Sequence, residues 1–211
     1  MIISHESPEY RMKRANTEVS NKFNGAYYYS KEIVENIIPH VRTNYNWVTI
    51  NIDKSLPHSI VFIHNNMDSG ERYKYLANYP DQILVVGVPE TASKVAHLGK
   101  TIYLPLSVDI ANVAQYKCEK TKDVAYVGRI DKFNGCKVEG DYIGGYPREI
   151  LLAHLAKYKR VYAVGRVAIE AKILGCEVLP YDPRFPSPDI WEPLDNLEAA
   201  KILQRELDML K

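Results

Sequence analysis

Short apolar runs alternate with amphipathic segments over most of the chain, and this alternation restricts the fold more than any other feature. The runs are short and rich in β-branched and aromatic residues, which is typical of strands. Strands are expected at 47–52, 58–64, 82–88, 101–106, 124–128, 160–165 and 176–181. Helices are expected at 69–79, 89–99, 107–116, 147–158, 166–175 and 192–210. Such alternation predicts an α/β fold in which helices wrap parallel sheets.

A polar stretch, "KCEKTKD" at 117–123, divides this pattern into two parts. We therefore expect two α/β units, residues 1–117 and 118–211, with the last helix in the second. The stretch 131–146 holds four glycines and is expected to be a loop. Ser107 is the expected cap of the helix that follows it.

Composition narrows the class of protein. The hydrophobic fraction of 46% predicts a packed core, and the net charge of +1 gives no global field toward nucleic acid or a membrane. No apolar run reaches the length of a membrane span, and the spacing of the ligand-type residues indicates no metal cluster. Three cysteines without CxxC spacing favour free thiols in a reducing cytoplasm. They are Cys118, Cys136 and Cys176. The composition and the cysteine spacing do not indicate an oligomeric state.

Two strand ends share the letters "VGR", at Gly128-Arg129 and at Gly165-Arg166. Ligands of open α/β sheets bind beyond the carboxyl ends of strands, where glycine admits a phosphate and arginine donates to it. The alternative is that the glycines only ease tight turns and the arginines are surface residues. Glu170 lies four residues after Arg166, which favours either a salt bridge on a solvated face or a carboxylate aimed at a ribose.

Three segments resemble the retaining GT-B glycosyltransferases, and they occur in that family's order. They are "YLPLSVD" (103–109), "AYVGR" (125–129) and "GRVAIEAKILGCEVLP" (165–180). The resemblance implies two Rossmann-like domains facing a cleft, with a nucleotide-sugar held mainly by the second. It also implies metal-independent transfer, with the nucleotide-sugar as co-substrate and no further cofactor.

The resemblance assigns roles to individual residues. Glu170 would hold the donor ribose, and Arg129 would neutralise the diphosphate during catalysis. The donor-binding set it implies is Gly128, Arg129, Lys132, Gly165, Arg166, Val167 and Glu170. The chain departs from the family at Tyr162, where a first glutamate is usual, and at Asn134, where a lysine is usual. Lys132 and Lys137 are the candidate substitutes for that lysine.

The first unit supplies the remaining candidates. The resemblance places His64 near the sugar as a catalytic residue, while the alternative is a histidine that satisfies local backbone groups. Asn65 and Glu90 are the candidates for acceptor binding, although Glu90 also matches the dipole of the helix that it begins. Arg148, at another helix start, indicates either a nearby anion or simple solvent exposure.

Three classes of function remain open at this stage. The first is a glycosyltransferase whose acceptor is a small molecule, a glycan, a protein or a modified DNA base. The second is a non-catalytic binder of nucleotides or nucleotide-sugars, and the third is a scaffold that only keeps the fold. Four basic residues allow nucleic acid as a partner through phosphate contacts: Arg11, Lys13, Arg14 and Arg42. The first three also fit a solvated tail.

Overall fold

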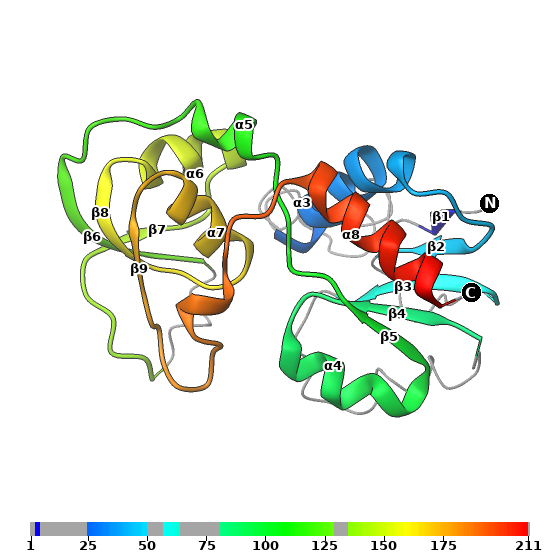
Figure 1. Ribbon diagram of the computed structural model, residues 1–211. Coiled ribbons are helices and arrows are strands. Elements are labelled where there is room, and N and C mark those ends of the chain that lie inside the picture. The colour runs from blue at the N-terminus through cyan, green and yellow to red at the C-terminus, as the bar shows by residue number, and fades with distance from the viewer. Residues whose placement is uncertain (1–2, 5–24, 50–56, 64–80, 129–134, 211) are drawn as a thin grey trace, which may run out of the picture. The chain divides into compact units, whose positions relative to one another are not determined.

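Two parallel β-sheets, one in each of two compact units, organise the chain (Figure 1). The computed structural model describes residues 3–4, 25–49, 57–63, 81–128 and 135–210. The α/β fold expected from the sequence is confirmed, because every strand pairing within the two sheets is parallel and helices connect the strands. Among the described residues, no helix is both long and apolar enough to cross a membrane.

The units differ from the division expected at residue 117. The first unit comprises residues 1–105 and 196–211, and the second comprises 106–195. Both ends of the second unit are joined by backbone contacts, since the N–H of Val108 donates to the carbonyl of Leu194 at 3.0 Å and Val108 forms a parallel bridge with Asp195. The C-terminal helix therefore groups with the first unit.

The first sheet has five strands in the order β1-β2-β3-β4-β5. They span Ile3–Ser4, Asn46–Val48, Ser59–Ile63, Ile83–Val86 and Lys100–Tyr103. Every residue of β3 and β4 is buried, which is typical of strands covered on both faces. Their near-continuous apolar sequences are thus explained by packing on two sides.

Alternate residues of these strands face two different layers. One face packs against α4 (Pro89–Val95) and the short helix η5 (Ala96–Leu98) that follows it. The core on this face contains Val48, Val61, Ile63, Leu84, Val86 and Val95. On the other face the rings of Trp47 and Phe62 stack with their centroids 6.0 Å apart.

A helical segment before β2 and the C-terminal helix pack together within the first unit. The segment comprises α3 (Gly25–Glu32), the π-helix η1 (Ile33–Ile37) and the 3₁₀ turn η2 (Ile38–His40), where no element was expected. The C-terminal helix is α8 (Asn196–Met209).

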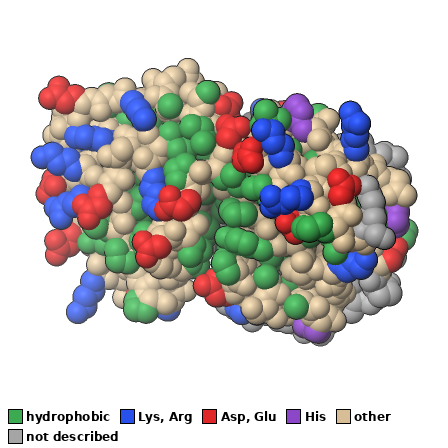
Figure 2. All heavy atoms as spheres, viewed as in Figure 1, with side chains coloured by type: hydrophobic (Ala, Val, Ile, Leu, Met, Phe, Trp, Pro, Cys, Tyr) green, Lys and Arg blue, Asp and Glu red, His purple; other side chains and the backbone are tan. Residues whose placement is uncertain are grey.

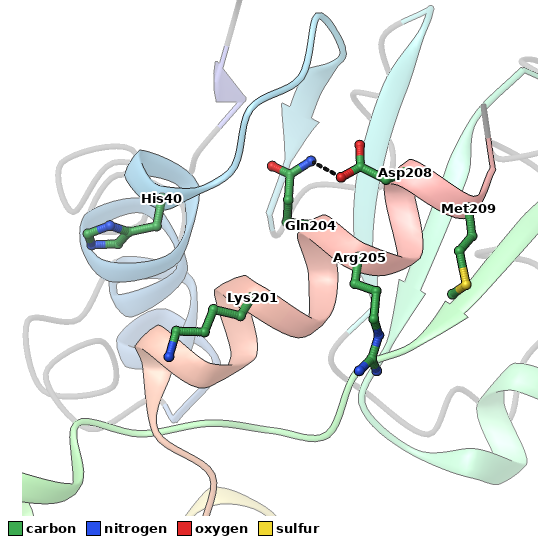
Figure 3. A pocket seen from close by; sticks show the side chains of 6 residues that line it. All are labelled: His40, Lys201, Gln204, Arg205, Asp208 and Met209. Atoms are coloured by element: carbon green, nitrogen blue, oxygen red, sulfur yellow. Dashed lines mark hydrogen bonds between the residues drawn. The ribbon is translucent and has the colours of Figure 1, made fainter.

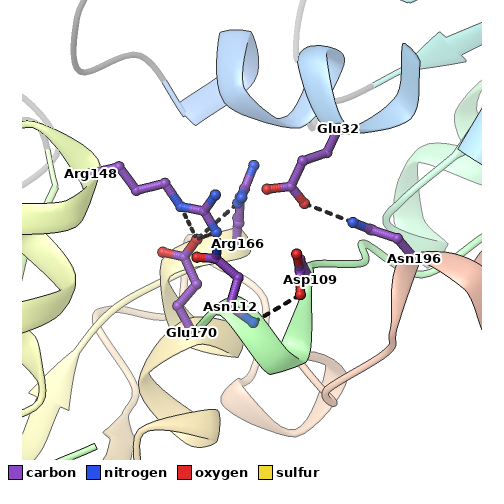
Figure 4. Close-up of polar contacts among 7 residues, drawn as sticks. All are labelled: Glu32, Asp109, Asn112, Arg148, Arg166, Glu170 and Asn196. Atoms are coloured by element: carbon purple, nitrogen blue, oxygen red, sulfur yellow. Dashed lines mark hydrogen bonds and ion pairs between the residues drawn. The ribbon is translucent and has the colours of Figure 1, made fainter. Parts of the chain in front are cut away.

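Polar bonds fix both ends of this packing. At the start of α8 the Asn196 amide donates to the buried Glu32 carboxylate at 3.0 Å (Figure 4). Further along, the Gln204 side chain accepts from the N–H of Arg42 at 2.6 Å.

The second sheet has four strands in the order β7-β6-β8-β9. In chain order they are β6 (Lys122–Val127), β7 (Asp141–Ile143), β8 (Tyr158–Tyr162) and β9 (Glu177–Leu179). The helices of this unit are α5 (Ile110–Ala114), α6 (Arg148–Leu155) and α7 (Arg166–Ile173). The connections through α6 and α7 both step in the same direction along the sheet, so right-handed crossovers place both helices on one face.

Two expectations for the second unit are wrong. Strand β7 lies inside the stretch expected to be a loop, and its sequence gave little signal because Asp141 and Tyr142 are exposed. Helix α5 is capped by Asp109, whose carboxylate accepts from the N–H of Asn112 at 2.9 Å, and not by Ser107. Ser107 is fully buried instead.

One expected helix of the first unit, at 69–79, lies outside the described residues.

Candidate functional site

The carboxyl ends of β6 and β8 flank a switch point of the second sheet. From β6 the chain passes to β7 on one side, and from β8 it passes to β9 on the other. Tyr126 pairs with Tyr162, so the two strands end at the same level. Gly128 directly follows β6, and Gly165 is the N-cap of α7 beyond β8. The structure therefore brings the two "VGR" glycines to adjacent strand ends, where α/β proteins commonly bind ligands.

Both glycines have backbone conformations that other residues rarely adopt. The φ angle is 137° at Gly128 and 67° at Gly165. A Cβ added at Gly165 would meet only Leu106 Cδ1, at 4.0 Å, so there is room beside this backbone. Helix α7 has no acidic residue in its first turn and no capping side chain. Its positive end is thus not neutralised by a carboxylate of that turn.

An arginine–glutamate–arginine cluster lies beside this helix start (Figure 4). Glu170 Oε1 accepts from Arg166 Nε at 2.9 Å and from Arg148 Nε at 3.1 Å, and Arg148 Nη2 lies 2.9 Å away. Glu170 is 2% exposed and Arg166 is 8% exposed. The i, i+4 pair of the sequence analysis is formed, but in a buried setting and not on a solvated face. The anion beside Arg148 is the chain's own Glu170.

This cluster ties together two helices that begin at the carboxyl edge of the sheet. Arg148 is the first residue of α6, and Arg166 is the first residue of α7. Two guanidinium groups and one carboxylate carry a formal charge of +1 between them. A buried carboxylate is stable when it is bound by charged donors in this way. The cluster thus places positive charge next to the glycine at the start of α7.

The remaining predicted residues are distributed as follows. Val167 is half-buried in the first turn of α7, and Lys137 is exposed. In the first unit Glu90 is exposed in the first turn of α4. The pKa of Tyr103 is raised, first by the partial burial of its own hydroxyl and then by the negative charge of Glu90. Four predicted residues lie outside the described part of the chain: His64, Asn65, Arg129 and Lys132. The basic residues Arg11, Lys13 and Arg14 lie outside it as well.

A second polar group lies at the carboxyl side of this sheet, and sequence reasoning missed only its cysteine. Arg184, after β9, donates to Asp182 at 2.6 Å and to Cys136 Sγ at 3.3 Å. Hydrogen bonds from Arg184 hold the pKa of Asp182 below its usual value. The Asp-Pro-Arg spacing signals the first contact, but no local pattern signals a cysteine 48 residues away in the chain.

A surface groove of about 560 Å³ lies in the first unit, along α8 and beside His40 (Figure 3). Its lining comprises His40, Lys201, Gln204, Arg205, Asp208 and Met209. Several of these side chains bind their neighbours on α8: Lys201 pairs with Glu198, and Gln204 donates to Asp208. The groove is wide open, and Lys201, Gln204 and Asp208 already have partners within the chain.

Comparisons with known proteins give no further guidance. No protein-family model matches the chain, and no curated protein or solved structure matches it either. Within the described ranges, no three or more His, Cys, Asp or Glu side chains gather as metal ligands would. In Figure 2 acidic and basic side chains are interspersed over the visible surface. The geometry at the carboxyl edge of the second sheet therefore carries the functional argument.

Proposed function

We propose that the second unit binds a nucleotide-diphosphate sugar, and that the protein is a glycosyltransferase that uses this sugar as its donor. One observation carries the binding step. Gly128 and Gly165, both with positive φ, lie at adjacent strand ends beside the switch point of the sheet. A GT-B arrangement of the two units and the transfer step are the finer parts of the proposal, and the resemblance of three sequence segments supports them.

The diphosphate is expected to approach the backbone at Gly165 and the first turn of α7. Helix N-termini bind phosphate because their N–H groups and the helix dipole both favour negative charge. The guanidinium groups of Arg148 and Arg166 add positive charge close by, held in place by Glu170. In this proposal Glu170 has a double task, since its carboxylate positions two arginines and also faces the ribose.

The reacting end of the donor depends on residues outside the described ranges. Arg129, with Lys132, is proposed to stabilise the departing diphosphate, and His64 is proposed to lie near the sugar. Asn65 and Glu90 are the proposed acceptor residues. The acceptor itself stays open among small molecules, glycans, proteins and nucleic acid.

A non-catalytic nucleotide binder is the second candidate. Tyr162 stands where the resemblance leads one to expect a glutamate. Its ring packs edge-on against the ring of Tyr181, with the ring centroids 6.1 Å apart. Glu170 Oε1 is already bound by two arginines. The tyrosine at position 162 favours binding without transfer, whereas the bound state of Glu170 bears on the ribose contact in both candidates.

The test uses a substitution that weakens phosphate binding at the start of α7 without destabilising the helix. Val167→Glu puts a carboxylate in the first turn of α7, which stabilises a helix start by about 0.3–1 kcal/mol. The same carboxylate would repel a bound diphosphate. Val167→Gln is the matched control, because it has nearly the same shape and no charge.

Binding is measured by isothermal titration calorimetry with nucleoside diphosphates and nucleotide-sugars. We expect one base to bind the parent and Val167→Gln, and binding to fall at least about tenfold in Val167→Glu, which corresponds to about 1.4 kcal/mol. Equal binding to all three proteins would exclude the site at α7, and no binding to the parent would exclude a donor pocket. Release of free sugar from the bound donor would then favour the transferase over the non-catalytic binder.

A further inference from the structure

Lys120 joins the C-terminal ends of two helices in the second unit. Its ammonium group donates to the carbonyls of Ala156 at 2.9 Å and Leu174 at 2.8 Å, which are the C-cap residues of α6 and α7. A cation at this position balances the negative ends of both helix dipoles. The third donor of the ammonium group points at Cys176 Sγ, 3.3 Å away. These contacts lie at the opposite ends of α6 and α7 from the proposed donor site.

Cys176 is held equally firmly. Helix α7 ends in a Schellman motif, in which the N–H of Gly175 donates to Lys172 and the N–H of Cys176 donates to Ala171, both at 2.9 Å. The thiol is 6% exposed and donates to the carbonyl of Leu155 at 3.5 Å. Burial raises the pKa of this thiol, while the charge of Lys120 acts in the opposite direction. The sulfur and the amine nitrogen are therefore fixed at contact distance by two separate backbone supports.

We propose that Lys120 and Cys176 form a covalent sulfenamide cross-link when the protein meets a peroxide. The peroxide first oxidises the thiol to a sulfenic acid and is itself reduced to water. The amine of Lys120, after losing a proton to solvent, attacks the sulfur, and hydroxide leaves as a second water. The sum is one thiol, one ammonium and one hydrogen peroxide giving one S–N bond, two waters and one proton. Sulfur loses two electrons and the peroxide gains them.

Geometry favours this bond over competing reactions of the sulfenic acid. Two groups already held at 3.3 Å react as an intramolecular pair, which removes most of the entropic cost of a bimolecular step. Sulfinic acid requires a second peroxide to reach the sulfur, whereas the amine is already in contact with it. A dithiol reductant reverses the bond: its first thiol attacks the sulfur and releases the amine, and its second thiol displaces the Cys176 thiol and closes a cyclic disulfide.

The chain contains an internal comparison for the same distance. Arg184 Nη2 also lies 3.3 Å from a cysteine sulfur, that of Cys136. A guanidinium group stays protonated and is not a nucleophile, so this pair is expected to give no S–N bond. A nitrogen in contact with the sulfur is thus not sufficient for the S–N bond to form, because the nitrogen must belong to an amine.

The experiment treats the purified full chain with hydrogen peroxide, digests it with trypsin and examines the peptides by mass spectrometry. We expect a peptide pair joined through Lys120 and Cys176, lighter by two hydrogen atoms than the sum of its parts, with no cleavage after Lys120. Dithiothreitol is expected to restore the separate peptides. Lys120→Arg keeps the charge at the helix ends but removes the amine, so it should retain the fold, measured by circular dichroism, and lose the cross-link. Cys176→Ala should lose it as well.

Three outcomes would overturn the proposal. The first is a parent protein in which Cys176 is recovered unmodified or as sulfinic acid without any cross-link. The second is a disulfide between Cys118 and Cys176 in place of the S–N bond. The third is a cross-link that persists in Lys120→Arg or that retains an oxygen atom between nitrogen and sulfur.

Discussion

Glu170 accepts hydrogen bonds from Arg148 and Arg166 while it is only 2% exposed. Its removal would leave two guanidinium groups close together with their shared carboxylate gone. Breaking a buried ion pair in this way typically costs 3–5 kcal/mol. We therefore expect Glu170→Ala to lower the free energy of unfolding by about 3–5 kcal/mol, measured by urea denaturation. Glu170→Gln should lose less, because its amide oxygen still accepts a hydrogen bond.

The control for this prediction is Glu139→Ala, which removes an exposed carboxylate from the same unit. Exposed charges usually contribute little, so its effect should be within about 0.5 kcal/mol. A similar small effect of Glu170→Ala would show that the buried cluster does not stabilise the unit. If the expected loss occurs, weaker ligand binding by Glu170→Ala would not identify a ribose contact. This is why Val167 carries the binding test.

At the scale of the elements, the sequence predicted those whose packing leaves a local pattern. The buried strands β3 and β4 are continuous apolar runs, and Gly175 marks the end of α7. Strand β7 gave no such pattern, because only Ile143 of its three residues is buried. The segment α3–η2 was not predicted at all. In the candidate site the two "VGR" strand ends were visible, but the contact between Arg148 and Glu170 joins separate helices and leaves no local signal.

Tyr181 links the segment after β9 to β6, and this contact leads to a prediction about alkaline stability. Its buried hydroxyl donates to the carbonyl of Val127 at 2.7 Å, and burial raises its pKa above the usual 10.0. Above about pH 10 the unfolded chain loses this proton while the folded chain keeps it, so stability falls as the pH rises. Tyr181→Phe should be less stable at pH 7 by about 0.5–1.5 kcal/mol, for the lost hydrogen bond.

The same substitution should reduce the loss of stability above pH 10, because phenylalanine cannot ionise. The measurement is the urea-derived free energy of unfolding of both proteins from pH 7 to 11. Tyr146→Phe is the control, because it removes the same hydroxyl from a ring that is 40% exposed. Parallel curves for the parent and Tyr181→Phe would contradict the prediction.

At the scale of the whole molecule, the first unit is discontinuous in sequence. The chain leaves it at residue 105, forms the second unit, and returns as α8. Leu203 and Leu207 of α8 are buried, and α8 packs against η1 and η2. The hydrophobic pattern of α8 shows that one face must be buried, but it does not show against which segment. For that reason the sequence assigned α8 to the second unit, which precedes it along the chain.

A matched pair of substitutions tests which unit α8 stabilises. Leu203 on α8 and Leu155 on α6 are both fully buried, and replacing such a leucine by alanine typically costs 2–5 kcal/mol. Amide hydrogen exchange reports the opening of each unit separately. We expect Leu203→Ala to speed exchange of the slowest amides in β3 and β4 by at least about tenfold and to leave β6 and β8 unchanged. Leu155→Ala should do the reverse. Faster exchange in β6 and β8 of Leu203→Ala would instead place α8 with the second unit, because a helix stabilises the core into which its leucines pack.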